Sequence, residues 1–167
     1  MVVVVVLIGI MAAMIIPEMK GTFDDALLRS TGRDLVNAFD LAASRAVSFN
    51  RSFRVVLDAQ NGRYAVEQKI HDATRENFAP LRDVAGAEGR LDSRIAVQVG
   101  QADEDSSPSQ NDSVAGAEQN SPAAISFYPD GTADAAEVHL RDRAGFQLVL
   151  RINPVTARVR VSEPAHE

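Results

Sequence analysis

Hydrophobic positions change their spacing twice along this chain of 167 residues, and the changes divide it into three parts. Residues 1–17 form a continuous apolar run that ends at a proline. Residues 18–50 carry apolar side chains at the three- and four-residue steps of an amphipathic helix. In residues 51–167, apolar and polar residues alternate in short segments, which is typical of β-strands. The sequence therefore predicts an α+β protein in which a long N-terminal helix packs on an antiparallel β-sheet head domain.

The apolar run contains no charged residue and has to leave water, either in a bilayer or among similar helices. As a helix it would be about 22 Å long, which is shorter than the ~30 Å hydrocarbon core of a membrane. Small residues within it allow other helices to approach closely. We expect the run to serve as a membrane anchor and a helix-packing surface. Its residues are Val2, Val3, Val4, Val5, Val6, Leu7, Ile8, Gly9, Ile10, Met11, Ala12, Ala13, Met14, Ile15, Ile16 and Pro17.

The amphipathic helix is predicted from Glu18 to Asn50, and Pro17 can kink the chain there without ending the preceding helix. Gly21 and Gly32 weaken it by ~1 kcal/mol each relative to alanine, so bends are expected at these positions. The residues predicted to share the face that covers one side of the sheet are Leu28, Leu35, Phe39, Ala42, Ala46 and Phe49.

A β-hairpin is predicted after the helix, because two alternating segments flank the turn pair Asn61-Gly62. Residues 70–89 show no clear period and contain Pro80, Gly86 and Gly89, so they are predicted to form a loop. Residues 91–99 are predicted to form a strand. The acidic stretch 100–122 has a single valine as its only large apolar residue and is predicted to be a disordered surface loop.

The C-terminal third is predicted to be an antiparallel meander, because short alternating segments follow one another across tight turns. The predicted strands are residues 124–128, 136–140, 146–152 and 158–161. The turns between them include Pro129-Asp130-Gly131 and Asp142-Arg143-Ala144-Gly145.

Composition excludes several functions. The net charge of −6 opposes indiscriminate binding to nucleic acid, and the lack of cysteine excludes disulfides and cysteine-bound zinc. His71, His139 and His166 lack the spacing of metal ligands, and no group of residues has the pattern of a catalytic site. We therefore expect no enzyme activity and no cofactor or metal.

Two charged groups have competing interpretations. Asp103, Glu104 and Asp105, or Asp130 with Asp134, could bind a cation, but solvated carboxylates are favoured because no EF-hand pattern is present. A set of arginines near the C-terminus could contact nucleic acid. Alternation along strands is expected to split the set between two faces, so salt-bridged surface arginines are favoured. The set is Arg141, Arg143, Arg151, Arg158 and Arg160.

Three segments in this order resemble the type IV pilin-like superfamily, specifically minor pseudopilins of the GspH/FimT type. They are the apolar run 1–17, the helix segment 35–47, and residues 125–132 with the strands that follow. One departure from the family is Thr156-Ala157 in the closing hairpin, where the family often has threonine-glycine. The resemblance implies a pilin-like fold without chemistry of its own.

The family also carries a short leader ending in glycine, then a phenylalanine and a glutamate before the apolar run. Alignment of Gly9 and Pro17 with that pattern places Met1 just after the usual glutamate position. We therefore expect the gene start to have been assigned to an internal methionine. Restoring about five residues would bring the helix to about 30 Å, the thickness of the membrane core. Prepilin peptidase is an expected partner only with that leader restored.

The resemblance implies a minor pseudopilin of a type II secretion system, anchored in the bacterial inner membrane by one span with its head in the periplasm. Its expected partners are other pseudopilins or pilins, through the N-terminal helix, and the inner-membrane assembly platform. A minor pilin of a type IV pilus or competence system fits the same residues. A membrane-anchored periplasmic binding domain that does not polymerise is the alternative from another class.

Overall fold

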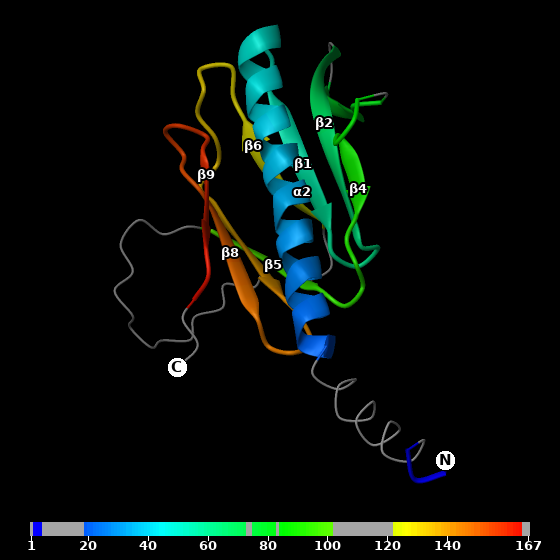
Figure 1. Cartoon of the computed structure of the whole chain (residues 1–167). Coiled ribbons are helices and arrows are strands. Elements are labelled where there is room, and N and C mark those ends of the chain that lie inside the picture. The colour runs from blue at the N-terminus through cyan, green and yellow to red at the C-terminus, as the bar shows by residue number, and fades with distance from the viewer. Residues whose placement is uncertain (1, 5–18, 73–74, 83, 102–121, 165–167) are drawn as a thin grey trace.

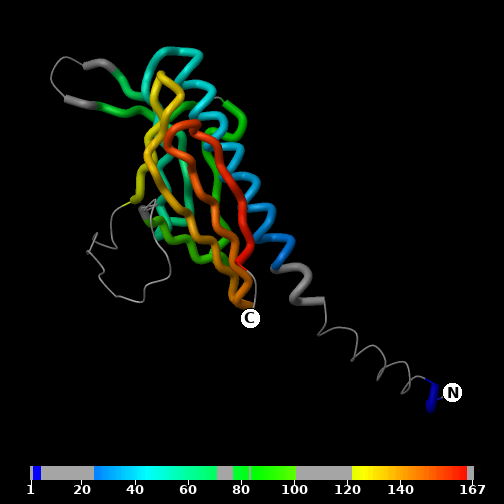
Figure 2. Tube along the Cα trace, turned by 90° about the vertical axis from the view of Figure 1, so that its left-hand side faces the viewer, coloured from blue at the N-terminus to red at the C-terminus, as the bar shows by residue number. Residues whose placement is uncertain are grey.

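The computed structural model describes residues 2–4, 19–72, 75–82, 84–101 and 122–164. Helix α2 (Met19–Phe49) lies across two antiparallel sheets (Figure 1 and Figure 2). The first sheet has the strand order β3-β2-β1-β6, with β4 also paired to β2, and the second has the order β5-β7-β8-β9. The strands are β1 (Phe53–Asp58), β2 (Arg63–Asp72), β3 (Arg75–Pro80), β4 (Glu88–Arg90), β5 (Ala96–Gln101), β6 (Ala123–Phe127), β7 (Ala136–Arg141), β8 (Gln147–Ile152) and β9 (Val159–Ser162).

The predicted helix is confirmed to within a residue at each end, and α2 continues through Gly21 and Gly32. Leu35, Phe39 and Ala42 of the predicted face are fully buried, as are most of its other members. Phe49 is the exception: it is 54% exposed, so its predicted burial is wrong. It is the last residue of α2 and precedes Asn50, whose φ of 49° ends the helix, and its ring lies against the Arg45 guanidinium.

The predicted hairpin is present as β1 and β2, with Asp58 opposite Arg63 at the turn. Gly62 takes the positive φ of 58° that the turn requires, and the Asp58 carboxylate accepts a hydrogen bond from the backbone N–H of Asn61. Phe53, Val55 and Leu57 face the core from β1. The alternation in this segment was therefore a reliable sign of a half-buried strand.

The loop predicted for residues 70–89 is only partly correct. Residues 81–82 and 84–87 are irregular, but β2 continues to Asp72 and pairs with β3, while β4 pairs with the other end of β2. Ile70 lies opposite Asn77, so this pairing brings apolar and polar residues together at an exposed edge. Strands that are held mainly by backbone hydrogen bonds need no alternating pattern. The guanidinium of Arg54 lies 3.8 Å from the centre of the Phe78 ring and adds a cation–π contact across three strands.

A single sheet covered by the helix was predicted, but the strands form two sheets. β6 pairs with β1, so that Phe127 lies opposite Phe53, whereas β7, β8 and β9 pair with one another and with β5. The predicted meander therefore holds only for β7–β9. The apolar face of α2 covers both sheets, and the rings of Phe39 and Phe127 meet in the core with centres 6.1 Å apart.

The strand predicted for residues 91–99 is only partly correct, because β5 begins at Ala96. Residues 92–95 form a turn just before β5. The backbone carbonyl of Asp92 accepts a hydrogen bond from the N–H of Ile95, and its carboxylate accepts one from the N–H of Arg94. Gly100 and Gln101, which were predicted to begin the acidic loop, belong to β5. Residues 102–121, and the disorder predicted for them, lie outside the described part of the chain.

Asp92 makes the stability of this turn sensitive to acid. Hydrogen bonds from the Arg94 side chain lower the pKa of Asp92 to about 2, from about 3.9 in an unfolded chain. A lowered folded-state pKa adds stability that is complete above about pH 5 and is lost as the pH falls toward 2. We expect Asp92→Asn to reduce the loss of unfolding free energy over that range. Urea unfolding at several pH values measures it; Asp40→Asn on α2 is the control, and an equal change in both variants would contradict the assignment.

Candidate interaction surface between the helix and the second sheet

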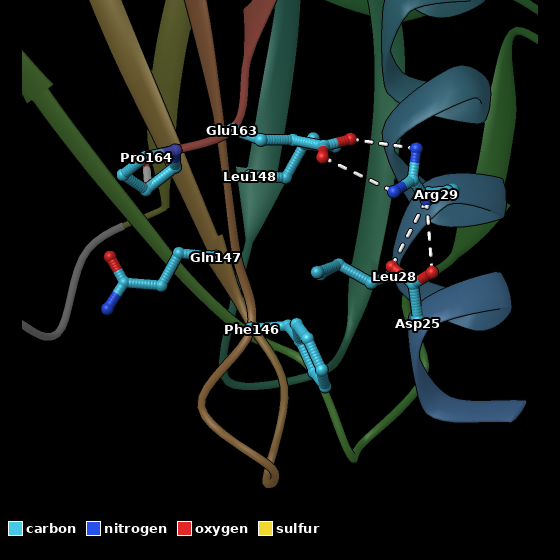
Figure 3. Close-up of a pocket in the computed structure, with 8 residues that line it drawn as sticks. All are labelled: Asp25, Leu28, Arg29, Phe146, Gln147, Leu148, Glu163 and Pro164. Atoms are coloured by element: carbon cyan, nitrogen blue, oxygen red, sulfur yellow. Dashed lines mark hydrogen bonds and ion pairs between the residues drawn. The ribbon is translucent and has the colours of Figure 1, made fainter. Parts of the chain in front are cut away.

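A groove runs between α2 and the strands β8 and β9, and it consists of two hollows. The first has a volume of about 330 Å³ (Figure 3). The ring of Phe146 and the side chains of Leu28 and Leu148 give it an apolar wall. The second hollow, of about 260 Å³, lies farther along the helix. We call the second one the α2–β9 hollow; its lining residues are Arg29, Gly32, Arg33, Val36, Asn37, Leu148, Val161 and Glu163.

Gly32 lets the Leu148 side chain pack closely against α2 at the floor of the α2–β9 hollow. A Cβ atom at this position would lie 2.4 Å from Cδ2 of Leu148, so the glycine allows α2 and β8 to approach closely. Leu148 is 4% exposed, whereas Val161 of β9 is 53% exposed although it faces the hollow. The floor of the hollow is thus apolar: it is buried at Leu148 of β8 and exposed to solvent at Val161 of β9.

An ion-pair cluster stands between the two hollows, since Arg29 and Glu163 line both. Nε of Arg29 lies 3.1 Å from Oδ1 of Asp25, and its Nη1 lies 2.8 Å from Oε1 of Glu163 (Figure 3). The hydrogen bond to Asp25, followed by the charges of Asp25 and Glu163, raises the pKa of Arg29. All three side chains are more than a third exposed, so these pairs contribute little to stability. Their main effect is to fix the end of β9 beside the helix.

A second surface is the face of α2 that points away from both sheets. It is polar and exposed along the helix, in contrast to the buried face. Exposed members include Ser30, Arg33, Asn37, Asp40 and Ser44. Helical spacing places them on one side, where another helix could pack.

The predicted anchor falls almost entirely outside the described residues. Val2, Val3 and Val4 are helical and 76%, 75% and 59% exposed, and the rest of the run to Pro17 is not described. Within the described part of the chain, no helix combines the length and apolarity needed to cross a membrane.

The C-terminal arginines were expected to split between two faces, but three of them share one. Glu137 lies opposite Arg151, and Arg151 lies opposite Arg160, all on the outer face of the second sheet. Arg141 projects from the same face of β7, because Val138 and Leu140 alternate with it and are buried. The Glu137 carboxylate forms an ion pair with Arg151, as the salt-bridge interpretation expected for this arginine.

The acidic residues and histidines that were considered as cation ligands do not come together in one site among the described residues. The Asp130 carboxylate accepts from Thr132, whereas the Asp134 carboxylate accepts from the Tyr128 hydroxyl and the Ser126 N–H. The hydrogen bond to Asp134 is the main cause of a raised pKa of Tyr128. His139 lies beside Glu137 on the second sheet, while His166 and residues 103–105 are not described, nor is the His71 side chain. Among the described residues, no cluster of three or more histidine, cysteine or acidic residues could hold a metal.

Sequence reasoning missed the groove, although Gly32 was noticed as a weak point of the helix. The signal that could have revealed it is a small residue on the buried face of an amphipathic helix. The contact between Arg29 and Glu163 leaves no local pattern in the sequence, because the two residues are 134 positions apart along the chain.

One helix laid across antiparallel sheets is the arrangement of pilin-like head domains, and comparisons with known proteins agree. The family model Type II transport protein GspH matches residues 31–162. The chain therefore belongs to the GspH family. None of the curated protein sequences matches it.

Solved structures with the same fold come from secretion and pilus systems. The minor pseudopilin EpsH of the Vibrio cholerae type II secretion system superposes with a TM-score of 0.63 at 11% identity, covering 87% of this chain and 99% of EpsH. The E. coli GspH solution structure gives 0.57 at 14% identity, with 83% and 89% coverage. The Pseudomonas aeruginosa type IV minor pilin FimU gives 0.52 at 14% identity, with 81% and 96% coverage. These similarities show a pilin-like α+β fold in which a helix packs on antiparallel sheets, whereas the single sheet predicted from the sequence is not found.

Proposed function

We propose that this protein is a minor pseudopilin of a type II secretion system. The observation that carries the proposal is the GspH family match over residues 31–162, on a chain that has the fold of such proteins. The groove and the polar face of α2 are surfaces for contact with neighbouring subunits. The protein acts by assembly, without chemistry of its own.

In this proposal, residues Val2 to Pro17 anchor the chain in the bacterial inner membrane by one span and later pack in the core of the fibre. Residues 18–50 continue the stalk, and residues 51–167 form the head in the periplasm. The apolar run supports this role, because it carries no charge and includes small residues at Gly9, Ala12 and Ala13. The partners are other pseudopilins, the assembly platform and, where a leader is present, the prepilin peptidase.

Gene deletion in the parent bacterium tests the proposal. We expect loss of type II substrates from the medium and their recovery when the full gene is returned. Returning it with Ile8→Arg should fail, because a charge within the run opposes membrane insertion, whereas the control Ile8→Leu should succeed. Immunoblots of membrane fractions and secreted protein measure both steps. Normal secretion after deletion would contradict the proposal.

A minor pilin of a type IV pilus or competence system is the second candidate, supported by the likeness to FimU. It predicts that the same deletion leaves secretion intact but abolishes surface pili or DNA uptake. Electron microscopy of the cells and a transformation assay therefore separate the two candidates in one strain.

A further inference from the structure

The outer edge of β9 has an unsatisfied backbone. The N–H of Asn153 donates to the carbonyl of Arg158, and the ladder continues from this pair with Arg151 opposite Arg160. Hydrogen-bonded pairs alternate along antiparallel strands, so Val159 and Val161 are in the intervening pairs. Their N–H and C=O groups therefore point away from β8, and within the described residues no backbone group bonds to them.

This free edge lies directly beside the α2–β9 hollow. Val161 remains 53% exposed there, and Gly32, Val36 and Leu148 provide the rest of an apolar floor. An extended segment that docks on a sheet edge gains main-chain hydrogen bonds from the edge and specificity from pockets that take every second side chain. At β9 the outward main-chain groups of Val159 and Val161 lie beside one such pocket, the α2–β9 hollow.

The charges around this edge are positive, although the whole chain has a net charge of −6. Among the described residues, no acidic side chain pairs with Arg33 at the rim of the hollow, nor with Arg158 or Arg160. Glu163, the nearest acidic residue along the chain, is paired with Arg29. Arg158 and Arg160 are two positions apart, as are Val159 and Val161, so basic and apolar positions alternate along β9.

We propose that β9 is a docking edge for an extended segment of another protein, in which apolar and acidic residues alternate. Its apolar side chains fill the α2–β9 hollow beside Val161, and its acidic side chains face Arg158 and Arg160 across the new pair of strands. This inference goes beyond assembly through helix packing and does not depend on it.

Natural edge strands are often protected by charges, prolines or short length, and β9 is short. However, Arg160 projects from the outer face, opposite Arg151, and leaves the outward N–H and C=O groups uncovered. The nearby prolines, Pro154 and Pro164, lie outside the strand. The positive charge of Arg160 therefore favours a partner segment with acidic residues, and it does not block the edge of β9.

The test uses the full chain in detergent micelles and a short fluorescein-labelled peptide of alternating valine and glutamate. Fluorescence anisotropy should show binding of this peptide and about tenfold weaker binding of the valine–lysine version. Val161→Pro removes an outward N–H without breaking the β8 ladder and should abolish binding. Arg160→Glu should reverse the preference between the two peptides, whereas Arg141→Glu, on the same outer face at β7, should preserve it.

Three outcomes would overturn the proposal: equal binding of both peptides, binding unchanged in Val161→Pro, or a preference unchanged in Arg160→Glu. Dimerisation of the chain that Val161→Pro removes, without peptide binding, would assign the edge to a second copy and also overturn it. Circular dichroism confirms that each variant is folded. None of these results bears on secretion, so failure here is distinguishable from failure of the proposed function.

Discussion

Replacing Phe39 with alanine is expected to lower the free energy of unfolding by about 3–5 kcal/mol. Phe39 is fully buried where α2 crosses the sheets, and its ring packs against the fully buried ring of Phe127 of β6. Removal of the ring loses both its burial and the aromatic contact, and leaves a cavity that the rigid strands cannot close. Domains of this size have about 5–15 kcal/mol of total stability, so the variant should be close to unfolding.

Phe49→Ala is the matched control, because it is the same substitution ten positions later in the same helix. Phe49 is 54% exposed, and its main described contact is with the Arg45 guanidinium, 5.2 Å from the ring centre. We expect its cost to be below about 1 kcal/mol. Urea unfolding of both variants, followed by circular dichroism in the same detergent, provides the comparison. Equal losses would contradict the packing described here.

The difference between these two phenylalanines shows what helical periodicity can and cannot predict about burial. Spacing places Phe39 and Phe49 on one face of α2, and it correctly identified the face as buried. Periodicity cannot tell where the covering sheet ends, because that depends on strands far away in the chain. Asn50, with its positive φ, ends the helix directly after Phe49, the residue of this face that is exposed.

Local patterns also explain which strands were predicted. The β1–β2 hairpin is half-buried and closed by Asn61-Gly62, so both its alternation and its turn are visible in the sequence. β3 and β4 pair with the two ends of β2 along the edge that faces away from β1, and their residues do not alternate between apolar and polar. The division into two sheets depends on β6 pairing with β1 across about 70 residues, which no short-range signal encodes.

The closing hairpin shows how a departure from the family pattern is accommodated. Ala157 occupies a left-handed conformation with φ of 52°, which glycine adopts more easily. Asn153 supports the turn, because its side-chain oxygen accepts hydrogen bonds from the N–H groups of Val155 and Thr156. Ala157 is also buried, which offsets part of the backbone strain.

For the candidate sites, sequence reasoning could identify residue types but not their partners. The apolar run was identified because it is continuous, and its role remains a prediction. The arginines of the outer face were noticed as a set, but only the register of β7, β8 and β9 shows that Arg141, Arg151 and Arg160 share a face. The groove combines residues from both ends of the chain, so only the folded structure reveals it.

Gly32→Val, on the groove side of α2, should destabilise the protein, with an expected loss of roughly 1–3 kcal/mol. Glycine is a poor helix former, so propensity alone would favour the variant. The structure predicts the opposite sign, because even a Cβ atom at this position would overlap Cδ2 of Leu148 at 2.4 Å and lie 3.8 Å from Leu140. Leu148 is buried against the helix, so its side chain has to shift from this packed position into the hollows that it lines before the new residue fits.

A double-mutant cycle with Leu148→Ala distinguishes this clash from a general effect on the helix. Leu148→Ala alone should cost about 2–5 kcal/mol, but in the Gly32→Val background the new side chain fills the space that the leucine leaves. The two losses should therefore sum to at least ~1 kcal/mol more than the loss in the double variant. Ser30→Val, at an exposed position of α2, provides the control that should not couple to Leu148. Additive losses for Gly32→Val and Leu148→Ala would show that the two residues do not meet, and that the helix is held away from the second sheet.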